Sequence, residues 1–335
     1  MTAPSAPWTV PVLSYPWPEA VSPLEHDEAL RREELSWLAE FYAELPAADR
    51  ERYGRQGLSL GAAAMFPYVG DLARMRPIAR YMLWLAIWDD HHESGTAAEL
   101  TAVCDRAVEI MRGAEPAADE AGPLRLLAVL RRELGDLPGF WTDRWIASFR
   151  ACATHGLLAE APFRQGLRRM PALAGLELIR EYSIGLYPFF HMTDAARGRV
   201  LPDDLYHHPA VQRSLALLCR ICTLQNDLYS LRKELDAPTS DLFNAVLLLQ
   251  RERGGSLTEA ITEVVAHHDR YVRELDSLLR HLSDLDPRLA AARPYVEQTT
   301  LIITGIDRWY RSPGTGRYRP DGFAQEVPRG AALPG

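Results

Sequence analysis

The chain has 335 residues, of which 47% are hydrophobic and 24% are charged, and its formal net charge at pH 7 is -8. This composition excludes a disordered chain, a collagen-like repeat and a small disulfide-bonded domain, and it predicts a globular protein with a substantial core. The negative charge, without any run of Lys or Arg, argues against nucleic acid as a partner.

The N-terminal segment is rich in proline, with six prolines in the first 23 residues. Proline disfavours helix, so residues 1–24 are predicted to form an extended strap over a folded body. No basic residue precedes Arg31, and the longest unbroken apolar run, residues 81–88, is far shorter than the roughly 18 residues that a membrane span needs. We therefore expect no secretory signal, no stable membrane insertion and a cytoplasmic location.

Residues 25–320 are predicted to form one α-helical domain, followed by a flexible tail over residues 321–335. Apolar residues recur three and four positions apart, which is the period of an amphipathic helix, and no convincing strand pattern occurs. The fold class is therefore all-α, a single-domain helical bundle. The predicted helices span residues 27–45, 58–92, 97–112, 123–136, 142–169, 172–195, 209–235, 241–252, 257–284 and 289–311.

An otherwise apolar helix, residues 173–192, contains Gly185 and Pro188. Proline removes a backbone hydrogen bond and kinks the helix axis. The interruption is either a simple bend or a device that aims backbone groups into a cavity, and the sequence leaves both open.

A cluster of acidic residues follows the apolar run that ends at Trp88 and begins with Asp89 and Asp90. Asp89 and Glu93 lie four residues apart, so both project from one helix face about 6 Å apart along the axis. Like charges repel at that spacing unless a cation lies between them, and hard oxygen ligands suit Mg²⁺. The alternative is a solvated helix end on which acidic residues happen to cluster.

A second set of oxygen donors, Asn226, Ser230 and Glu234, recurs every four residues along one predicted helix. The set drifts only about 80° around the helix and forms a column roughly 12 Å long, which can hold one cation. Lys233 adds a positive charge beside this column and is the only lysine in the chain.

The run from Asn226 to Glu234, Asn-Asp-x-x-Ser-x-x-Lys-Glu, resembles the metal-binding triad motif of bacterial class I terpene synthases at all five specified positions. Residues 89–93, Asp-Asp-x-x-Glu, resemble the aspartate-rich motif of the same family, with Glu in place of the usual final Asp. The resemblance extends over about residues 60–320. It implies a helical bundle of the class I terpenoid synthase type, with an active-site cavity between the helices.

The resemblance also implies the cofactor and the residues that bind it. Three Mg²⁺ ions would assemble together with the diphosphate of the substrate. The implied metal ligands are Asp89, Asp90, Glu93, Asn226, Ser230 and Glu234.

Two further features match the family. In relatives an arginine that senses diphosphate lies 46 residues before the triad asparagine, a position held here by Arg180. The helix interruption then provides a linker residue, Ser183, and an effector residue, Ile184, whose carbonyl would face the ionising carbon. Near the C-terminus, an Arg-Tyr pair also matches the family. The implied catalytic residues are Arg180, Ser183, Ile184, Lys233, Arg317 and Tyr318.

This chemistry would ionise a linear prenyl diphosphate to an allylic cation, which water would quench unless the pocket were dry and lined by ring faces. We expect farnesyl diphosphate as the substrate and a cyclic terpene hydrocarbon or alcohol as the product, with geranylgeranyl diphosphate as the alternative substrate. Relatives often carry aromatic residues where this chain has Leu85 and Ala86, and the smaller side chains would deepen the pocket. The candidate pocket residues are Phe66, Leu85, Ala86, Phe189 and Trp309.

Three other functions compete with cyclisation. A prenyl diphosphate synthase that elongates chains needs a second aspartate-rich motif, and Asp203-Asp204 lacks the following carboxylate. A His-Asp metal phosphohydrolase would use the doublets at 26–27 and 268–269, which lack the intervening ligand pattern. A non-catalytic helical binding protein is the third alternative. The sequence is compatible with a monomer or a homodimer.

Overall fold

The computed structural model describes residues 9–24, 27–92, 95–236 and 243–312, and these residues form helices and connecting segments without any β-strand. The prediction of an all-α bundle is therefore confirmed. The elements are α1 (Glu28–Phe41), α2 (Ala47–Gln56), α3 (Leu58–Met65), α4 (Leu72–His92), α5 (Ala97–Met111), α6 (Gly122–Gly135), α7 (Thr142–Ala151), the π-helical turn η1 (Cys152–Leu157), α8 (Leu158–Arg164), α9 (Leu173–Ser183), α10 (Tyr187–Arg197), α11 (Asp203–Tyr206), α12 (Pro209–Asp236), α13 (Ala245–Arg253), α14 (Leu257–Arg280), α15 (Leu282–Leu285), the 3-10 helix η2 (Pro287–Ala291) and α16 (Arg293–Arg311).

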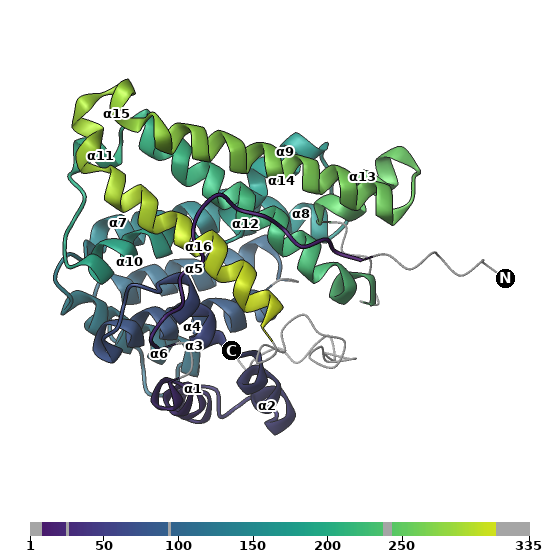
Figure 1. Ribbon diagram of the computed structural model, residues 1–335. Coiled ribbons are helices and arrows are strands. Elements are labelled where there is room, and N and C mark those ends of the chain that lie inside the picture. Colours follow the sequence, from purple (N-terminus) through teal and green to yellow (C-terminus); the bar gives the residue numbers. More distant parts are fainter. Residues whose placement is uncertain (1–8, 25–26, 93–94, 237–242, 313–335) are drawn as a thin grey trace.

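The 28-residue helix α12 runs through the middle of the bundle (Figure 1). It packs against α14, α16 and α9, while α3 joins α4 to α16. Capping fixes where several helices begin. In α14, for example, Ser256 accepts a hydrogen bond from the Glu259 backbone, and the Glu259 side chain accepts one from the Ser256 backbone. Among the described residues, no helix is long and apolar enough to cross a membrane.

The predicted continuous helix over residues 58–92 is wrong, because the structure divides it into α3 and α4. The break begins at Phe66, whose backbone angles of φ -122° and ψ 58° are not helical. Phe66 precedes Pro67, and the proline ring disfavours the α conformation in the residue before it. The prediction also missed α2 and α11, which are short helices within segments expected to be irregular.

The predicted interruption near Gly185 and Pro188 is present. Helix α9 ends at Ser183, and α10 begins at Tyr187 with Pro188 in its first turn. Gly185 joins the two helices with φ +73°, in the left-handed region that other residues adopt only with strain. The segment therefore contains two helices that meet at a fixed break.

Residues 9–24 run extended across α12, α14 and α16 (Figure 1). The Tyr15 hydroxyl accepts a hydrogen bond from Gln225 Nε2 at 2.5 Å and lies 3.1 Å from His268 Nε2. Further along, Glu19 pairs with Arg311 at 3.0 Å. One tyrosine thus connects this segment to the back of the helix that carries the Asn-Ser-Glu triad.

Replacing Tyr15 with Phe should lower the free energy of unfolding by about 1–3 kcal/mol, because the buried Gln225 amide and the His268 ring both lose a partner. Urea unfolding followed by circular dichroism measures the difference. Val12→Ala is the matched control, since Val12 lies in the same segment and is 78% exposed. Equal stability of Tyr15→Phe and the control would contradict this role.

Candidate active site

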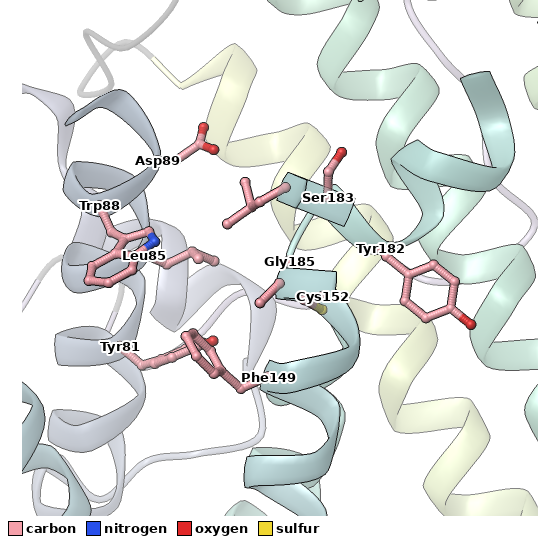
Figure 2. Close-up of a pocket in the computed structure, with 11 residues that line it drawn as sticks. Tyr81, Leu85, Trp88, Asp89, Phe149, Cys152, Tyr182, Ser183 and Gly185 are labelled. Atoms are coloured by element: carbon pink, nitrogen blue, oxygen red, sulfur yellow. The ribbon is translucent and has the colours of Figure 1, made fainter. Parts of the chain in front are cut away.

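The two acidic motifs meet in space although they lie far apart in the chain. Asp90, at the C-terminal end of α4, pairs with Lys233 of α12 across 3.5 Å, and 143 residues separate the two. Asp89 is the neighbouring carboxylate on α4 and lies at the rim of a pocket (Figure 2). The structure therefore brings Asp89, Asp90 and the C-terminal end of α12, which carries Lys233, together at the rim of this pocket.

The triad residues follow one another along α12. Ser230 donates a hydrogen bond to Glu234 Oε1 at 2.6 Å, and Asn226 Nδ2 donates one to the Tyr310 hydroxyl at 3.1 Å. Glu234 Oε2 is buried and has no hydrogen-bond partner among the described residues. Burial, together with the nearby negative charge of Asp227, raises the pKa of Glu234 to about 7. A cation beside such a buried carboxylate would stabilise its charged form.

The donors present fit a hard divalent cation. In the described part of the chain, no three His, Cys, Asp or Glu side chains converge as a metal site, so a metal here would depend also on the amide oxygen of Asn226 and the hydroxyl of Ser230. Carboxylate, amide and hydroxyl oxygens are the ligands that Mg²⁺ accepts, and no sulfur or imidazole belongs to the set.

Arg180 joins α9 to the triad helix. Its Nη2 atom donates to Asn226 Oδ1 at 3.0 Å and to Asp227 Oδ1 at 2.7 Å, and its Nη1 lies 3.9 Å from Glu160. The side chain is buried, which by itself would lower the pKa of the guanidinium. The carboxylates of Asp227 and Glu160 outweigh this effect and hold the pKa of Arg180 above its ordinary value. The predicted diphosphate sensor is therefore a fixed positive charge that directly touches a triad residue.

An apolar pocket lies below this charged rim (Figure 2). The Asp89 carboxylate and the Ser183 hydroxyl lie at its upper end, while Leu85, Tyr81 and Phe149 lie further down; the Tyr182 ring points away from it. The Ser183 hydroxyl is buried and has no hydrogen-bond partner within the described residues. The lining residues are Tyr81, Leu85, Trp88, Asp89, Phe149, Cys152, Ala153, Leu157, Tyr182, Ser183 and Gly185.

Of the five predicted pocket residues, only Leu85 lines this pocket among the described side chains. Phe66 and Phe189 are fully buried in one aromatic cluster, in which the Phe189 ring centroid lies 5.0 Å from that of Tyr81. Trp309 is also buried, and its Nε1 donates to the Gly57 carbonyl. Ala86 lies on the buried side of α4 beside Leu85. A substrate contact by these four residues stays a prediction.

Of the remaining predicted residues, one is described by the structure and three are not. Ile184 forms the C-cap of α9, where its N–H donates to the Arg180 carbonyl at 3.0 Å. Three predicted residues lie outside the described residues: Glu93, Arg317 and Tyr318.

Sequence reasoning missed three residues that build the rim, namely Asp227, Glu160 and Tyr310. Asp227 accepts hydrogen bonds from Arg180 and from the Ala245 backbone, so it also anchors the start of α13. Because Asp227 is itself part of the triad motif, the motif could have identified it as a site residue. Neither Glu160 nor Tyr310 carries a local pattern that would have marked it, because each reaches the rim only through packing of distant helices.

The helical bundle and its rim of oxygen donors above an apolar pocket have the architecture expected for a class I terpenoid synthase. The chain belongs to the terpene synthase family: residues 80–274 match the model described as terpene synthase family 2, C-terminal metal binding. It is therefore an enzyme, a bacterial class I terpene synthase, and the family resemblance predicted from its motifs is confirmed.

Relatives that are named terpene-forming synthases agree with this assignment. A 10-epi-cubebol synthase of Sorangium cellulosum is 32% identical over 259 residues, which cover 74% of this chain and 79% of the relative. A (+)-(1(10)E,4E,6S,7R)-germacradien-6-ol synthase of Streptomyces pratensis is 30% identical, covering 99% of this chain and 92% of the relative. Among solved structures, a-eudesmol synthase superposes with a TM-score of 0.78 at 19% identity, over 89% of this chain and 98% of that one, which supports the fold.

Replacing Asp227 with Ala should lower the free energy of unfolding by about 3–5 kcal/mol, because Arg180 would keep a buried charge without its main partner. Urea unfolding measures the loss. The double variant Arg180→Leu/Asp227→Leu, which buries no charge at this position, should recover a large part of it. A single variant as stable as the wild type would contradict the importance of this pair.

Proposed function

We propose that this terpene synthase is a Mg²⁺-dependent cyclase of farnesyl diphosphate that releases diphosphate and a cyclic terpene hydrocarbon or alcohol. The observation that carries the proposal is the contact of the two motif helices through Asp90 and Lys233, next to Asp89, which lines an apolar pocket. The substrate is supported by a relative from Roseiflexus castenholzii, 28% identical over 94% of this chain and 95% of its own length, which is named a (+)-T-muurolol synthase that cyclises (2E,6E)-farnesyl diphosphate.

At the rim, Asp89 and Asp90 of α4 would hold metal on one side, and Asn226, Ser230 and Glu234 of α12 on the other. Bound Mg²⁺ supplies Lewis-acid neutralisation of the diphosphate charge. Lys233 and Arg180 would add N–H donors to the diphosphate oxygens, since Arg180 contacts Asn226 and Lys233 precedes Glu234 on α12 and pairs with Asp90. Glu93, Arg317 and Tyr318 belong to this proposal through the family motifs.

The reaction begins when the bond between the first prenyl carbon and its oxygen breaks, and the bonding electron pair leaves with the diphosphate. The resulting cation closes a ring by accepting the electron pair of a distant double bond. It is then quenched either by loss of a proton from a neighbouring carbon or by addition of water followed by loss of a proton. The first quench gives a hydrocarbon and the second an alcohol.

The pocket walls would protect the cation. Tyr81, Trp88 and Phe149 present aromatic rings to the pocket, and ring faces attract positive charge by up to about 2 kcal/mol where water is excluded. These three residues add to the predicted aromatic pocket residues, which are Phe66, Phe189 and Trp309.

Two alternatives are not favoured. Asp203 and Asp204, the only candidate for a second aspartate pair, lie at α11, where they pair with Arg144 and Arg288 respectively. Neither aspartate lines the pocket described above. Of the two His-Asp doublets, His26 lies outside the described residues, and His268 contacts Tyr15 and Asp269 on α14.

Replacing Asn226 with Ala should lower kcat/KM on the order of 100-fold, because one metal loses an oxygen ligand while the apolar pocket is unchanged. Purified enzyme is incubated with geranyl, farnesyl or geranylgeranyl diphosphate, with Mg²⁺ or with EDTA, and a hydrocarbon extract is analysed by gas chromatography and mass spectrometry. A cyclic product that forms only with Mg²⁺ and most rapidly from farnesyl diphosphate is the expected result.

Arg213→Ala is the matched control for this variant, because Arg213 lies on the same helix and is partly exposed, where it pairs with Glu274. It should leave turnover unchanged. Full activity of Asn226→Ala, or longer diphosphates formed on addition of isopentenyl diphosphate, would refute the proposal.

Replacing Leu85 with Ala should favour geranylgeranyl over farnesyl diphosphate by roughly 10-fold in the ratio of kcat/KM values, because the shortened side chain opens room in the pocket. Steady-state assays with both substrates measure the ratio. Met82→Ala, a change on the same helix at a side chain that does not line the pocket, should leave it unaltered. A ratio that moves equally in both variants would argue against a pocket role for Leu85.

A further inference from the structure

A π-helical turn packs directly against the helix break that borders the pocket. This turn, η1, lies between α7 and α8 and contacts the C-terminal end of α9. The i→i+5 pattern of a π-helix places residues five apart on nearly the same side of the turn, and Cys152 and Leu157 accordingly both line the pocket. Next to the turn, Ser183 and Gly185 of the break line the same pocket. The turn and the break thus form two adjoining parts of one wall.

The contact between them passes through Gly156. A Cβ atom built on Gly156 would lie 2.5 Å from the Ser183 nitrogen, 2.7 Å from the Ser183 Cα and 2.8 Å from the Tyr182 carbonyl carbon. All three are backbone atoms, which cannot rotate away as the end of a side chain can. Any residue other than glycine would therefore push the turn and the end of α9 apart, by roughly an ångström.

The end of α9 is held firmly on its other side. Arg180 is bonded to α12, as described above, and Thr223 Oγ1 donates to the Arg180 carbonyl at 3.2 Å. Displacement at Gly156 would therefore not move α9 as a whole. It would be absorbed at Ser183, Ile184 and Gly185, where the helix ends.

We propose that Gly156 is a positioning residue for cyclisation, which sets the location of the Ser183–Gly185 break in the pocket wall by close backbone contact. This inference rests on the proposed function, since the predicted linker and effector residues lie in that break. Gly156 touches no substrate in this proposal, and it acts only through the backbone of Ser183. Because the break borders the space in which the prenyl chain folds, a shift of this wall changes which double bond the cation meets.

The test is Gly156→Ala, with Gly135→Ala as the matched control. Gly135 also lies in a helix, α6, but a Cβ there meets nothing within 4 Å. With the preferred prenyl diphosphate, Gly156→Ala should change the ratio of products measured by gas chromatography and lower kcat/KM by roughly 10- to 100-fold. The control should retain both the ratio and the rate.

Two readouts separate positioning from a general loss of stability. The rise in Tm on addition of MgCl₂ and inorganic diphosphate should persist in Gly156→Ala, because the rim residues are unchanged. Amide hydrogen exchange should increase in the peptide covering residues 180–187 and remain as in the wild type elsewhere in α9. A folded Gly156→Ala that keeps the wild-type product ratio and the wild-type exchange would overturn the proposal.

His155→Ala covers the case in which Gly156→Ala does not fold. The exposed His155 ring packs edge-on against Tyr182, with centroids 5.2 Å apart, so its removal loosens the same contact without a clash. A smaller change of the same kind in product ratio supports the proposal, and an unchanged ratio overturns it. If the wild type converts none of the three prenyl diphosphates, the proposed function fails, and hydrogen exchange in residues 180–187 alone decides whether Gly156 sets the break.

Discussion

A buried guanidinium needs negative partners, and the partners of Arg180 determine how the walls of this active site meet. Its contacts with Asp227 and Asn226 join α9 to α12 at the depth of the triad, and its approach to Glu160 adds α8. Removing the Asp227 carboxylate would leave the buried Arg180 charge without its main partner, at a cost of several kcal/mol. These contacts hold the guanidinium beside the triad before any substrate arrives, and preorganised donors of this kind stabilise a leaving diphosphate.

Different faces of helix α12 carry the predicted metal ligands and the residues that hold the helix in place. Asn226 and Ser230 face the rim, whereas Gln225 and Tyr229, each one residue earlier, face the N-terminal segment and α16. Gln225 bonds to Tyr15 and to the Ile303 carbonyl, and Tyr229 bonds to the buried Asp307. The same four-residue period thus generates a column of oxygen donors on one face of α12 and a column of supporting hydrogen bonds on the neighbouring face, about 100° around the helix.

Described residues of the two predicted motifs come together in the structure, whereas only Leu85 of the predicted pocket residues lines the pocket among the described side chains. Motif residues such as Asn226 and Lys233 carry their spacing within one helix, so local geometry is enough to group them. Phe66 and Trp309 are predicted pocket residues because a carbocation needs ring faces around it, but the sequence cannot distinguish an aromatic residue of the core from one that lines a cavity. The prediction of a continuous helix over 58–92 is wrong for a simpler reason, since Pro67 disfavours the α conformation of Phe66 and ends the first helix there.

What could not be predicted depends on contacts between backbones. Gly156 and Gly305 are unremarkable within their helices, yet a Cβ on Gly156 would collide with Ser183, and one on Gly305 would lie 2.1 Å from the Ala64 carbonyl oxygen. Such close approaches arise only when helices that are distant in the chain pack against each other, and no residue pattern within one helix predicts them. Side-chain ion pairs such as Arg180–Asp227 join helices at the rim, where long side chains can reach from one helix to the next. In the pocket wall, a backbone contact at Gly156 joins η1 to the end of α9, so the position of that wall depends on the absence of a side chain at residue 156.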